Sequence, residues 1–308
     1  MSNVDIITER DPYVVKEKIT MSNGVEMPII GVSSWLTEFT AKDDIKTAIR
    51  TGYRMIDVAT VYNNLKAIGQ AIKEMIEENV IWTFNIFPDS IHEEMCQALN
   101  KLHVDRVDLV LAHSPAVHMV LDETTFKQIW REFDALIVEG LTRSIEVCNW
   151  ASEQISCAIA LGLTPIHNRQ SEIGEFFPGF EQWDLCAKHK ITITIYVTFG
   201  SPNGVNFTLS VNPIIMKWVR YKLEDHFAVT LAAFEHHKYG AHVILRNAVG
   251  AGFILKPSSV HADKINEALN VFDFELTELE KEEISQSIHL EKRVDHRILD
   301  AMLLKFEN

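Results

Sequence analysis

The stretch GYRMIDVATVY, residues 52–62, ends an apolar run with an acid and a phenol five residues apart. Asp57 follows the strand-like residues 55–56, and Tyr62 stands just before the helical pattern that begins near Asn64. A phenol can donate a proton, and a buried charge beside it can tune or orient that donor. The pair is therefore a candidate proton-transfer site. The alternative is structural: an Asp that caps a helix and a Tyr that packs in the core would give the same sequence.

On both sides of this stretch, short apolar runs alternate with amphipathic helical patterns along the chain. Several runs are apolar on both faces, which is typical of buried parallel strands. Strands are expected at 29–32, 54–58, 80–85, 107–113, 143–148, 165–170, 191–197 and 252–255. Helices are expected at 41–50, 64–77, 91–102, 123–138, 152–161, 181–189, 225–238 and 262–271. This alternation predicts an α/β fold of the (β/α)₈ TIM-barrel type.

A doubly wound parallel sheet is the structural alternative, but no GxGxxG motif follows an early strand, which counts against its dinucleotide-binding version. Residues 19–28, ITMSNGVEMP, predict an N-terminal β-hairpin with Asn23-Gly24 as its two-residue turn, placed to close the barrel floor. The tail, 291–308, carries apolar residues at helical spacing and is expected to pack on the body. We expect a single domain over 1–308, with the barrel at about 29–290.

The composition narrows the classes of partner. The chain of 308 residues is 47% hydrophobic, which suits a sizeable core, and its formal net charge of −14 argues against nucleic acid and anionic membranes. No apolar run is long enough to span a membrane, and the polar N-terminus fits neither a signal nor a transit peptide, so a cytoplasmic location is expected. The cysteines form no CxxC pair, and no second cluster joins His103 or His236-His237, so neither a disulfide nor a metal site is expected.

Polar residues stand where the predicted strands end. In such a barrel the working residues lie at the C-terminal ends of the strands. A Tyr, a His and an Asp that converge on one mouth suit protonation of a carbonyl oxygen. In chain order these ends carry Asp57 and Tyr62, then Asn85, His113, Cys148-Asn149, Gln170, Tyr196 and Ser258-Ser259.

This order resembles the aldo-keto reductase family over roughly residues 18–290. The resemblance implies that NADPH lies across the barrel mouth and delivers hydride to a small-molecule aldehyde or ketone. It implies a Tyr that donates the proton with help from an Asp, a Lys and a His, and, since many relatives are monomers, a monomer. The matching segments are NGVEMPIIG (23–31), GYRMIDVATVY (52–62), VDLVLAHSP (107–115), EGLTRSIEVCNW (139–150), ITITIYVTFGSP (191–202) and VFDFELT (271–277).

Carried over by position, Tyr62 matches the proton donor, Asp57 its acidic partner, and His113 the residue that orients the substrate carbonyl. Trp35 matches an aromatic residue of the substrate pocket. The Lys that sits against the Tyr in this family is replaced by Asn85, which can donate a hydrogen bond but brings no charge. Without a cation the phenol should revert towards its unperturbed pKa near ~10, so Asn85→Lys should raise turnover.

The cofactor residues are matched in part. Asn149 matches a contact to the nicotinamide carboxamide, Gln170 is a looser match to a second one, and Tyr196 matches the ring that stacks on the nicotinamide. Ser34 belongs to a Ser-Ser pair where the family has Gly-Thr, and Ser201 keeps one pyrophosphate contact.

The end of the last strand departs further from the family. Ser258 stands where the family has the Lys that holds the 2′-phosphate, Ser259 follows it, and Lys264 replaces an Arg, without the fork of a guanidinium. Lys256 lies two residues before the expected lysine, on the strand, where it can point elsewhere. Glu146 replaces a Gly and adds a charge that a barrel interior must accommodate.

Two interpretations stay open. The first is an NAD(P)H-dependent carbonyl reductase with impaired activity that keeps Asp57, Tyr62 and His113, with NADH more competitive than usual because the 2′-phosphate lysine is lost. The second is a catalytically inactive relative with a binding or structural role, as resembled by lens proteins and potassium-channel accessory subunits of the superfamily. A nucleophilic Cys148 is disfavoured because no His lies nearby in sequence.

Overall fold

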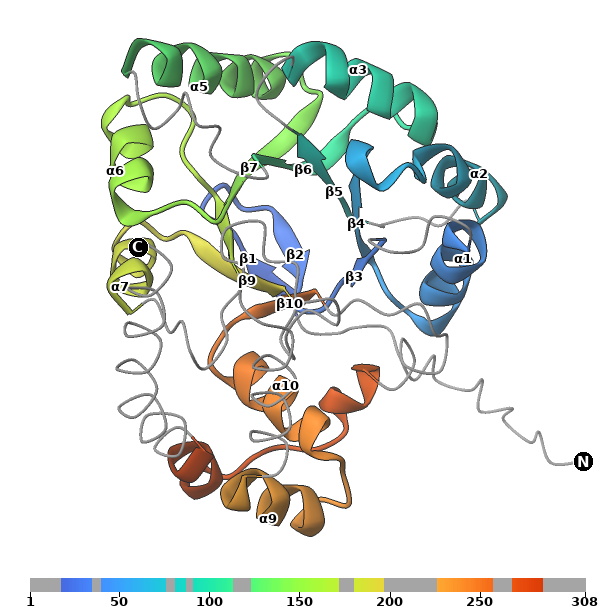
Figure 1. The fold of residues 1–308 in the computed structure, drawn as a ribbon, viewed down its shortest axis with the longest axis vertical. Coiled ribbons are helices and arrows are strands. Elements are labelled where there is room, and N and C mark those ends of the chain that lie inside the picture. Colours follow the sequence, from blue (N-terminus) through green and yellow to red (C-terminus); the bar gives the residue numbers. More distant parts are fainter. Residues whose placement is uncertain are drawn as a thin grey trace, which may run out of the picture.

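The computed structural model describes residues 18–34, 40–75, 81–86, 91–112, 123–171, 180–196, 226–256 and 268–284. In this part of the chain, strands and helices alternate around one closed sheet (Figure 1). The elements are β1 (Lys18–Thr20), β2 (Glu26–Pro28), β3 (Val32–Ser33), α1 (Ala41–Thr51), β4 (Met55–Ala59), the 3₁₀ helix η1 (Thr60–Tyr62), α2 (Leu65–Met75), β5 (Ile81–Ile86), α3 (Ile91–Leu102), β6 (Val107–Ala112), α5 (Glu123–Val138), β7 (Thr142–Cys148), α6 (Ser152–Ala160), β8 (Asn168–Ser171), α7 (Phe180–Lys188), β9 (Thr192–Tyr196), α9 (Phe227–Glu235), α10 (Gly240–Gly250), β10 (Ile254–Lys256) and η2 (Ala268–Phe272).

The main sheet has eight strands in the order β10-β9-β8-β7-β6-β5-β4-β3, and all neighbours are parallel. A parallel bridge between Ile30 and Leu255 joins its two ends. Two backbone hydrogen bonds make this closure, from Gly31 N to Leu255 O and from Leu255 N to Ile29 O, each 2.8 Å long. The predicted (β/α)₈ barrel is confirmed, and a sheet closed in sequence order excludes the doubly wound alternative.

The element prediction agrees closely with the structure, because the buried strands and amphipathic helices carry a clear period. Helices α3 and α5 have the expected bounds, and β4 is buried at every position, as its unbroken apolar character indicates. The sequence missed α10, which packs Leu245 and Val249 into the main core and Val243 into a second cluster with α9. This helix begins at Gly240 and ends at Gly250, and glycine is a poor helix former.

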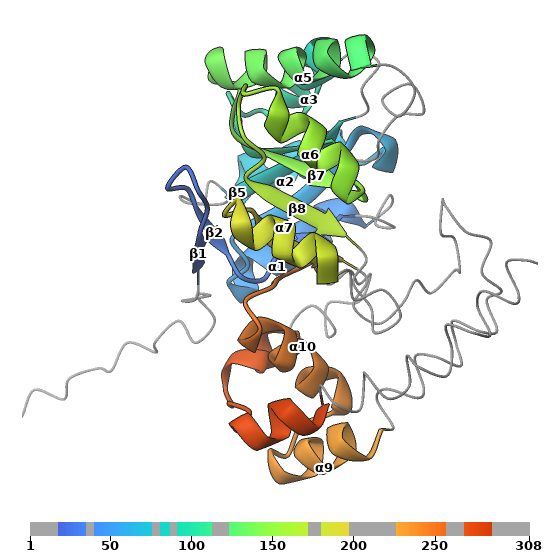
Figure 2. The same cartoon turned by 90° about the vertical axis from the view of Figure 1, so that its left-hand side faces the viewer.

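The N-terminal hairpin closes one end of the barrel (Figure 2). Its residues Met21, Val25 and Met27 are buried against side chains from β4, β6 and β10, namely Met55, Leu109 and Ile254. We call these six residues the floor. The hairpin therefore lies where the sequence predicted it, as an apolar plug beneath the strands.

The turn of this hairpin differs from the prediction. Thr20 pairs with Glu26, and Met21 N donates to Val25 O at 2.9 Å, so the loop spans 22–24 rather than Asn23-Gly24 alone. Only Gly24 has a positive φ, of 82°, whereas a type I′ turn needs positive φ at both central residues. Asn23 is used differently: its Nδ2 donates to Arg143 O and to Ser144 Oγ, each at 2.9 Å, and so fastens the hairpin to β7.

The helices form an outer layer around the sheet, and the main core lies between the two (Figure 1). Trp130 of α5 and Trp150 are fully buried there, with ring centroids 5.7 Å apart. Gly69 lets α2 approach α3 closely, because a Cβ at this position would lie 2.1 Å from the Lys101 carbonyl oxygen. None of the helices within the described ranges has the length and apolar character needed to cross a membrane.

Candidate active site

Asp57 is the centre of a polar layer inside the barrel. Asp57 lies on β4 in register with Ser33 of β3 and Thr83 of β5, and it is 3% exposed. Its Oδ1 accepts a hydrogen bond from Thr83 Oγ1 at 2.8 Å, and its Oδ2 accepts one from Ser33 Oγ at 3.3 Å. A buried carboxylate needs such donors, and neighbouring parallel strands supply them from equivalent heights.

Tyr62 lies close to Ser33 and Asp57 of this layer. β4 ends at Ala59, η1 carries the chain over to Tyr62, and Asn63 ends the turn with a φ of 55°, a conformation that Asn tolerates. The nearby Ser33 hydroxyl acts to lower the pKa of the phenol. Burial and the charge of Asp57 outweigh this effect and raise the pKa of Tyr62 well above its ordinary value, so the phenol is protonated at neutral pH.

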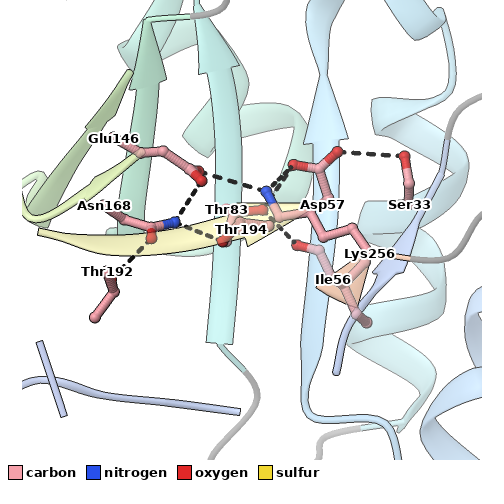
Figure 3. Close-up of polar contacts among 9 residues, drawn as sticks. All are labelled: Ser33, Ile56, Asp57, Thr83, Glu146, Asn168, Thr192, Thr194 and Lys256. Atoms are coloured by element: carbon pink, nitrogen blue, oxygen red, sulfur yellow. Dashed lines mark hydrogen bonds and ion pairs between the residues drawn. The ribbon is translucent and has the colours of Figure 1, made fainter. Parts of the chain in front are cut away.

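Lys256 of β10 lies in the same layer, with its side chain 1% exposed. Its Nζ is 3.1 Å from Asp57 Oδ1 and 3.4 Å from Glu146 Oε2, and Figure 3 shows the ammonium between the two carboxylates. Burial alone would lower its pKa, but Asp57 and Glu146 outweigh burial and raise it. The lysine is therefore a permanent cation inside the barrel, and the charge of Glu146 is accommodated by an ion pair.

Glu146 is the second carboxyl of the layer and is fully buried on β7. Burial raises its pKa, Lys256 lowers it and Asp57 raises it, with a net rise. Its Oε1 accepts a hydrogen bond from Asn168 Nδ2 at 2.6 Å, and the same nitrogen donates to Thr194 Oγ1 at 2.6 Å (Figure 3). The polar layer thus runs across the barrel from β3 to β9.

Cys148 carries no nucleophilic character in this setting. It is buried, and burial, followed by the charge of Glu146, raises the pKa of its thiol well above the ordinary value. A thiol with a raised pKa stays protonated and unreactive at neutral pH.

A second group of predicted residues lies together at the ends of β7, β8 and β9. Tyr196 Oη donates to Asn149 Oδ1 at 3.0 Å, and Asn149 follows β7 with a φ of 59°. Gln170 is 5% exposed, and its Nε2 meets no acceptor at ordinary distance among the described residues, although the amide lies close enough to lower the pKa of Glu146. An aromatic ring, an amide and an unsatisfied buried donor fit a planar carboxamide-bearing ring such as nicotinamide.

The structure brings together only part of the predicted site. Ser34 is buried beside Asp57, to whose carbonyl its backbone N–H donates at 2.9 Å. Asn85 lies on β5 in register with Ala59 and Leu111, two residues beyond Thr83. The predicted residues outside the described ranges are Trp35, His113, Ser201, Ser258, Ser259 and Lys264.

Six residues of the polar layer were not predicted as site residues: Ser33, Thr83, Glu146, Asn168, Thr194 and Lys256. The sequence placed Lys256 on a strand but gave it no partner, because the strand register that aims it at Asp57 is a tertiary property. One signal could have found it. Glu146 stands between Ile145 and Val147, Lys256 follows Ile254 and Leu255, and buried charges of opposite sign are normally paired.

The chain is similar to known proteins in sequence and in fold. A model of the aldo/keto reductase family matches residues 30–289. The uncharacterized oxidoreductase YtbE of Bacillus subtilis is 31% identical over 278 residues, which cover 86% of this chain and 90% of that protein. The aldo-keto reductase family 1 member A1 of Xenopus tropicalis is 28% identical over 288 residues, which cover 85% of each protein.

A solved structure is also similar to this chain. The aldose reductase of Schistosoma japonicum aligns with a TM-score of 0.73 at 26% sequence identity. The alignment covers 88% of this chain and 91% of that one, so the likeness extends over the whole barrel.

Proposed function

The chain belongs to the aldo/keto reductase family, and from this premise we propose that it is an NAD(P)H-dependent carbonyl reductase with impaired activity. Members of the family reduce small-molecule carbonyl compounds and generally use NAD(P)H. The observation that carries the proposal is the placement of Tyr62 just after β4, where the charge of the buried Asp57 acts on its phenol. This placement holds a protonated phenol beside a buried carboxylate, which is what protonation of a carbonyl oxygen requires.

In the proposed reaction the bound nicotinamide supplies the hydride, and Tyr62 supplies the proton. The Oη–H bond of Tyr62 breaks as a new O–H bond forms on the former carbonyl oxygen of the substrate. The Ser33 hydroxyl donates its single proton to Asp57 Oδ2, so it can stabilise the phenolate that remains only if that proton turns towards the phenolate oxygen. The phenol regains its proton from solvent or from its hydrogen-bonded neighbours before the next turnover.

The raised pKa of Tyr62 favours one direction of the reaction. Reduction needs the phenol, which is the form present at neutral pH, whereas oxidation of an alcohol needs the phenolate as base. A donor with a high pKa is also a weaker acid, so proton transfer is slower than with a donor matched to the working pH. The account therefore assigns a slow reductase, with the reverse oxidation confined to alkaline pH.

The cofactor is proposed to bind with its nicotinamide against Tyr196, Asn149 and Gln170, for which the geometry fits. The phosphate-side residues from the resemblance, Ser201, Ser258, Ser259 and Lys264, complete the proposed site together with Ser34. Because Ser258 lacks the charge of a lysine, NADPH loses part of its advantage and NADH can compete.

The substrate side is proposed from the resemblance. His113 would orient the carbonyl, and Trp35 would line the pocket. The proposed substrate is a small aldehyde or ketone, and the proposed setting is a cytoplasmic monomer.

A second candidate function is a catalytically inactive binding or structural protein. One observation favours it: Lys256 bonds the Asp57 carboxylate, while the charge that acts most strongly on the Tyr62 phenol is that of the anionic Asp57. Under this alternative the barrel keeps its polar layer for stability or ligand binding, and hydride transfer does not occur.

A nucleotide titration separates the two candidates. Purified protein is titrated with NADPH and, separately, with NADH, and quenching of tryptophan fluorescence is followed. The reductase account expects saturable binding of one or both in the micromolar range, and then oxidation of the bound nucleotide by a member of an aldehyde and ketone panel. Absence of binding at millimolar nucleotide would contradict it and leave the inactive alternative.

A further inference from the structure

Arg169 of β8 is a buried cation that takes no part in the proposed reaction, and it is 3% exposed. Asn168, one residue earlier on the strand, bonds Glu146 and Thr194 in the barrel interior. Successive residues of a strand point to opposite faces of a sheet, so Arg169 points towards the helices, where it bonds Gln182 of α7. The guanidinium therefore lies behind the sheet, on the side away from the polar layer.

All hydrogen bonds of Arg169 go to neutral acceptors. Its Nη1 donates to Ser171 Oγ at 3.0 Å, and its Nη2 donates to Gln182 Oε1 at 2.5 Å and to Trp150 O at 3.4 Å. Within the described ranges no carboxylate forms an ion pair with this guanidinium. Burial lowers the pKa of Arg169, but an arginine stays charged at neutral pH. A buried charge without a counter-ion costs stability, so an apolar side chain would serve better if filling space were the only role.

The acceptors of Arg169 come from three parts of the barrel. Ser171 ends β8, Gln182 lies on α7, and Trp150 follows the end of β7. A guanidinium presents its donors in a rigid planar fork, which neither an ammonium nor a side-chain amide reproduces. Arg169 therefore fixes the ends of two neighbouring strands relative to α7.

The bond to Trp150 O bears on Asn149, the residue before it. Asn149 has a φ of 59°, its N–H donates to Gln170 O at 3.0 Å, and its Oδ1 accepts the Tyr196 hydroxyl at 3.0 Å. The Trp150 side chain is 1% exposed, so the residue that follows Asn149 is anchored by its ring and by its carbonyl. Asn149 is thus held by Gln170 and Tyr196 directly, and by Arg169 through Trp150.

We propose that Arg169 is a positioning residue of the nicotinamide site: its buried guanidinium fixes the carbonyl of Trp150 and so holds Asn149 where its side-chain amide meets Tyr196. The proposal rests on the proposed function for the identity of the ligand, but its structural content is the link from Arg169 to Asn149. It follows that Arg169 acts on the nicotinamide end of the nucleotide and leaves the ADP end alone.

The competing explanation is that Arg169 only fastens α7 to the sheet through Gln182. Arg169→Met removes all the hydrogen bonds of the guanidinium and keeps an unbranched side chain in the layer. Gln182→Leu is the matched control, because it removes the bond to α7 and leaves the bonds to Trp150 and Ser171. Asn149→Gly removes the side chain that Arg169 is proposed to position, and glycine accepts the positive φ at this place.

The experiment has one readout without ligand and one with it. Hydrogen exchange of the Asn149 backbone N–H is followed by NMR in the free protein. Affinities are then measured by calorimetry for NADH and NADPH, each beside the same nucleotide without its nicotinamide, ADP-ribose and 2′-phospho-ADP-ribose. In Arg169→Met we expect faster exchange at Asn149 than in Gln182→Leu, ~10-fold weaker binding of the whole nucleotide, and unchanged binding of the fragment. In the Asn149→Gly background, Arg169→Met should weaken binding no further, since the two residues act as one unit.

Other outcomes overturn the proposal. If exchange rises only in α7, and Arg169→Met binds nucleotides as Gln182→Leu does, Arg169 serves the packing of α7. Equal losses for the whole nucleotide and for the fragment also contradict it, because the damage is then not confined to the nicotinamide end. If the wild type binds no nucleotide, the proposed function fails, and the exchange at Asn149 alone supports or overturns the link to Arg169. If Arg169→Met does not fold, Arg169→Lys carries the same comparison, because it keeps the charge and loses the fork.

Discussion

The two ends of the barrel interior are built from the same strands, but one end is apolar and the other is charged. On β4, Met55 belongs to the apolar floor and Asp57, two residues later, to the charged layer. On β10, Ile254 and Lys256 repeat this step. Alternate residues of a strand point to the same face. A step of two residues along either strand therefore leads from the apolar floor to the charged layer. The floor supplies stability by excluding water, and the layer above it holds polar chemistry that an apolar interior would not need.

This difference predicts which substitutions should alter stability and which should alter the chemistry of the site. A substitution in the floor should change the free energy of unfolding and leave the chemistry of folded molecules alone. A substitution at the charged layer or the mouth above it should change the chemistry or ligand binding more than the stability. The following predictions either break this division or sharpen it.

Tyr62→Phe should have the largest effect on activity. Loss of the proton donor removes ~10²–10⁴-fold in turnover, the usual contribution of a general acid. Ser33 remains bonded to Asp57, so the thermal midpoint should stay close to that of the wild type. The rate of NADPH consumption with a carbonyl substrate measures the first effect and calorimetry the second. Tyr239→Phe, at a residue 72% exposed, is the control, and equal rates in all three proteins would remove Tyr62 from the mechanism.

Met55→Ala should act in the opposite manner. The side chain is 0% exposed in the floor, and truncation of a buried Met costs ~2–5 kcal/mol of stability. Denaturant unfolding checks this value, and turnover per folded molecule should be unchanged. Val138→Ala, at a residue 80% exposed, provides the comparison. A large loss of turnover without loss of stability would show that the floor and the charged layer are not separable.

His167 should make the protein less stable in acid. His167 directly precedes β8 and is buried. Its Nδ1 accepts a hydrogen bond from the Ile145 N–H at 3.0 Å, and burial lowers its pKa to about 4. An unfolded histidine has a pKa near ~6.5, so the stabilisation is present above that pH and is lost as the pH falls from ~6.5 to ~4, by up to ~3 kcal/mol.

Unfolding by denaturant at a series of pH values measures this slope. His167→Asn removes the titrating group and should flatten the curve in that window. His103→Asn is the control, because His103 is exposed with a φ of 59° that Asn accepts, and it should leave the slope as it is. An unchanged slope in His167→Asn would assign the acid sensitivity to other groups.

Tyr196→Phe should have the smallest effect. It keeps the ring but removes the hydrogen bond from Oη to Asn149 Oδ1, worth about 0.5–1.5 kcal/mol. Nucleotide affinity should therefore weaken by ~2–10-fold, as seen by fluorescence titration, with stability unaffected. An affinity equal to that of the wild type would move the nicotinamide away from this group.

The sequence predicted the barrel because the strands are apolar runs and each predicted helix carries one apolar stripe. It predicted Asp57 and Tyr62 because they share one short stretch whose local order survives folding. It did not predict α10, whose terminal glycines lower its helix propensity, nor the partner of Lys256, which lies 199 residues away along the chain. The expectation that Asn85→Lys would raise turnover by placing a cation beside Tyr62 stays a prediction, while Lys256 already supplies a cation to Asp57 from another strand.

The most direct test of the account is transfer of deuterium from NADPH deuterated at the reactive carbon of the nicotinamide. The protein is incubated in excess over a mixed panel of aldehydes and ketones, and the alcohols formed are analysed by mass spectrometry, so that even a slow reaction is seen. The account predicts a deuterated alcohol with wild type and a strong loss with Tyr62→Phe. Saturating binding of NADPH without any deuterated alcohol would contradict it, and the charged layer would then belong to a barrel that binds without reducing.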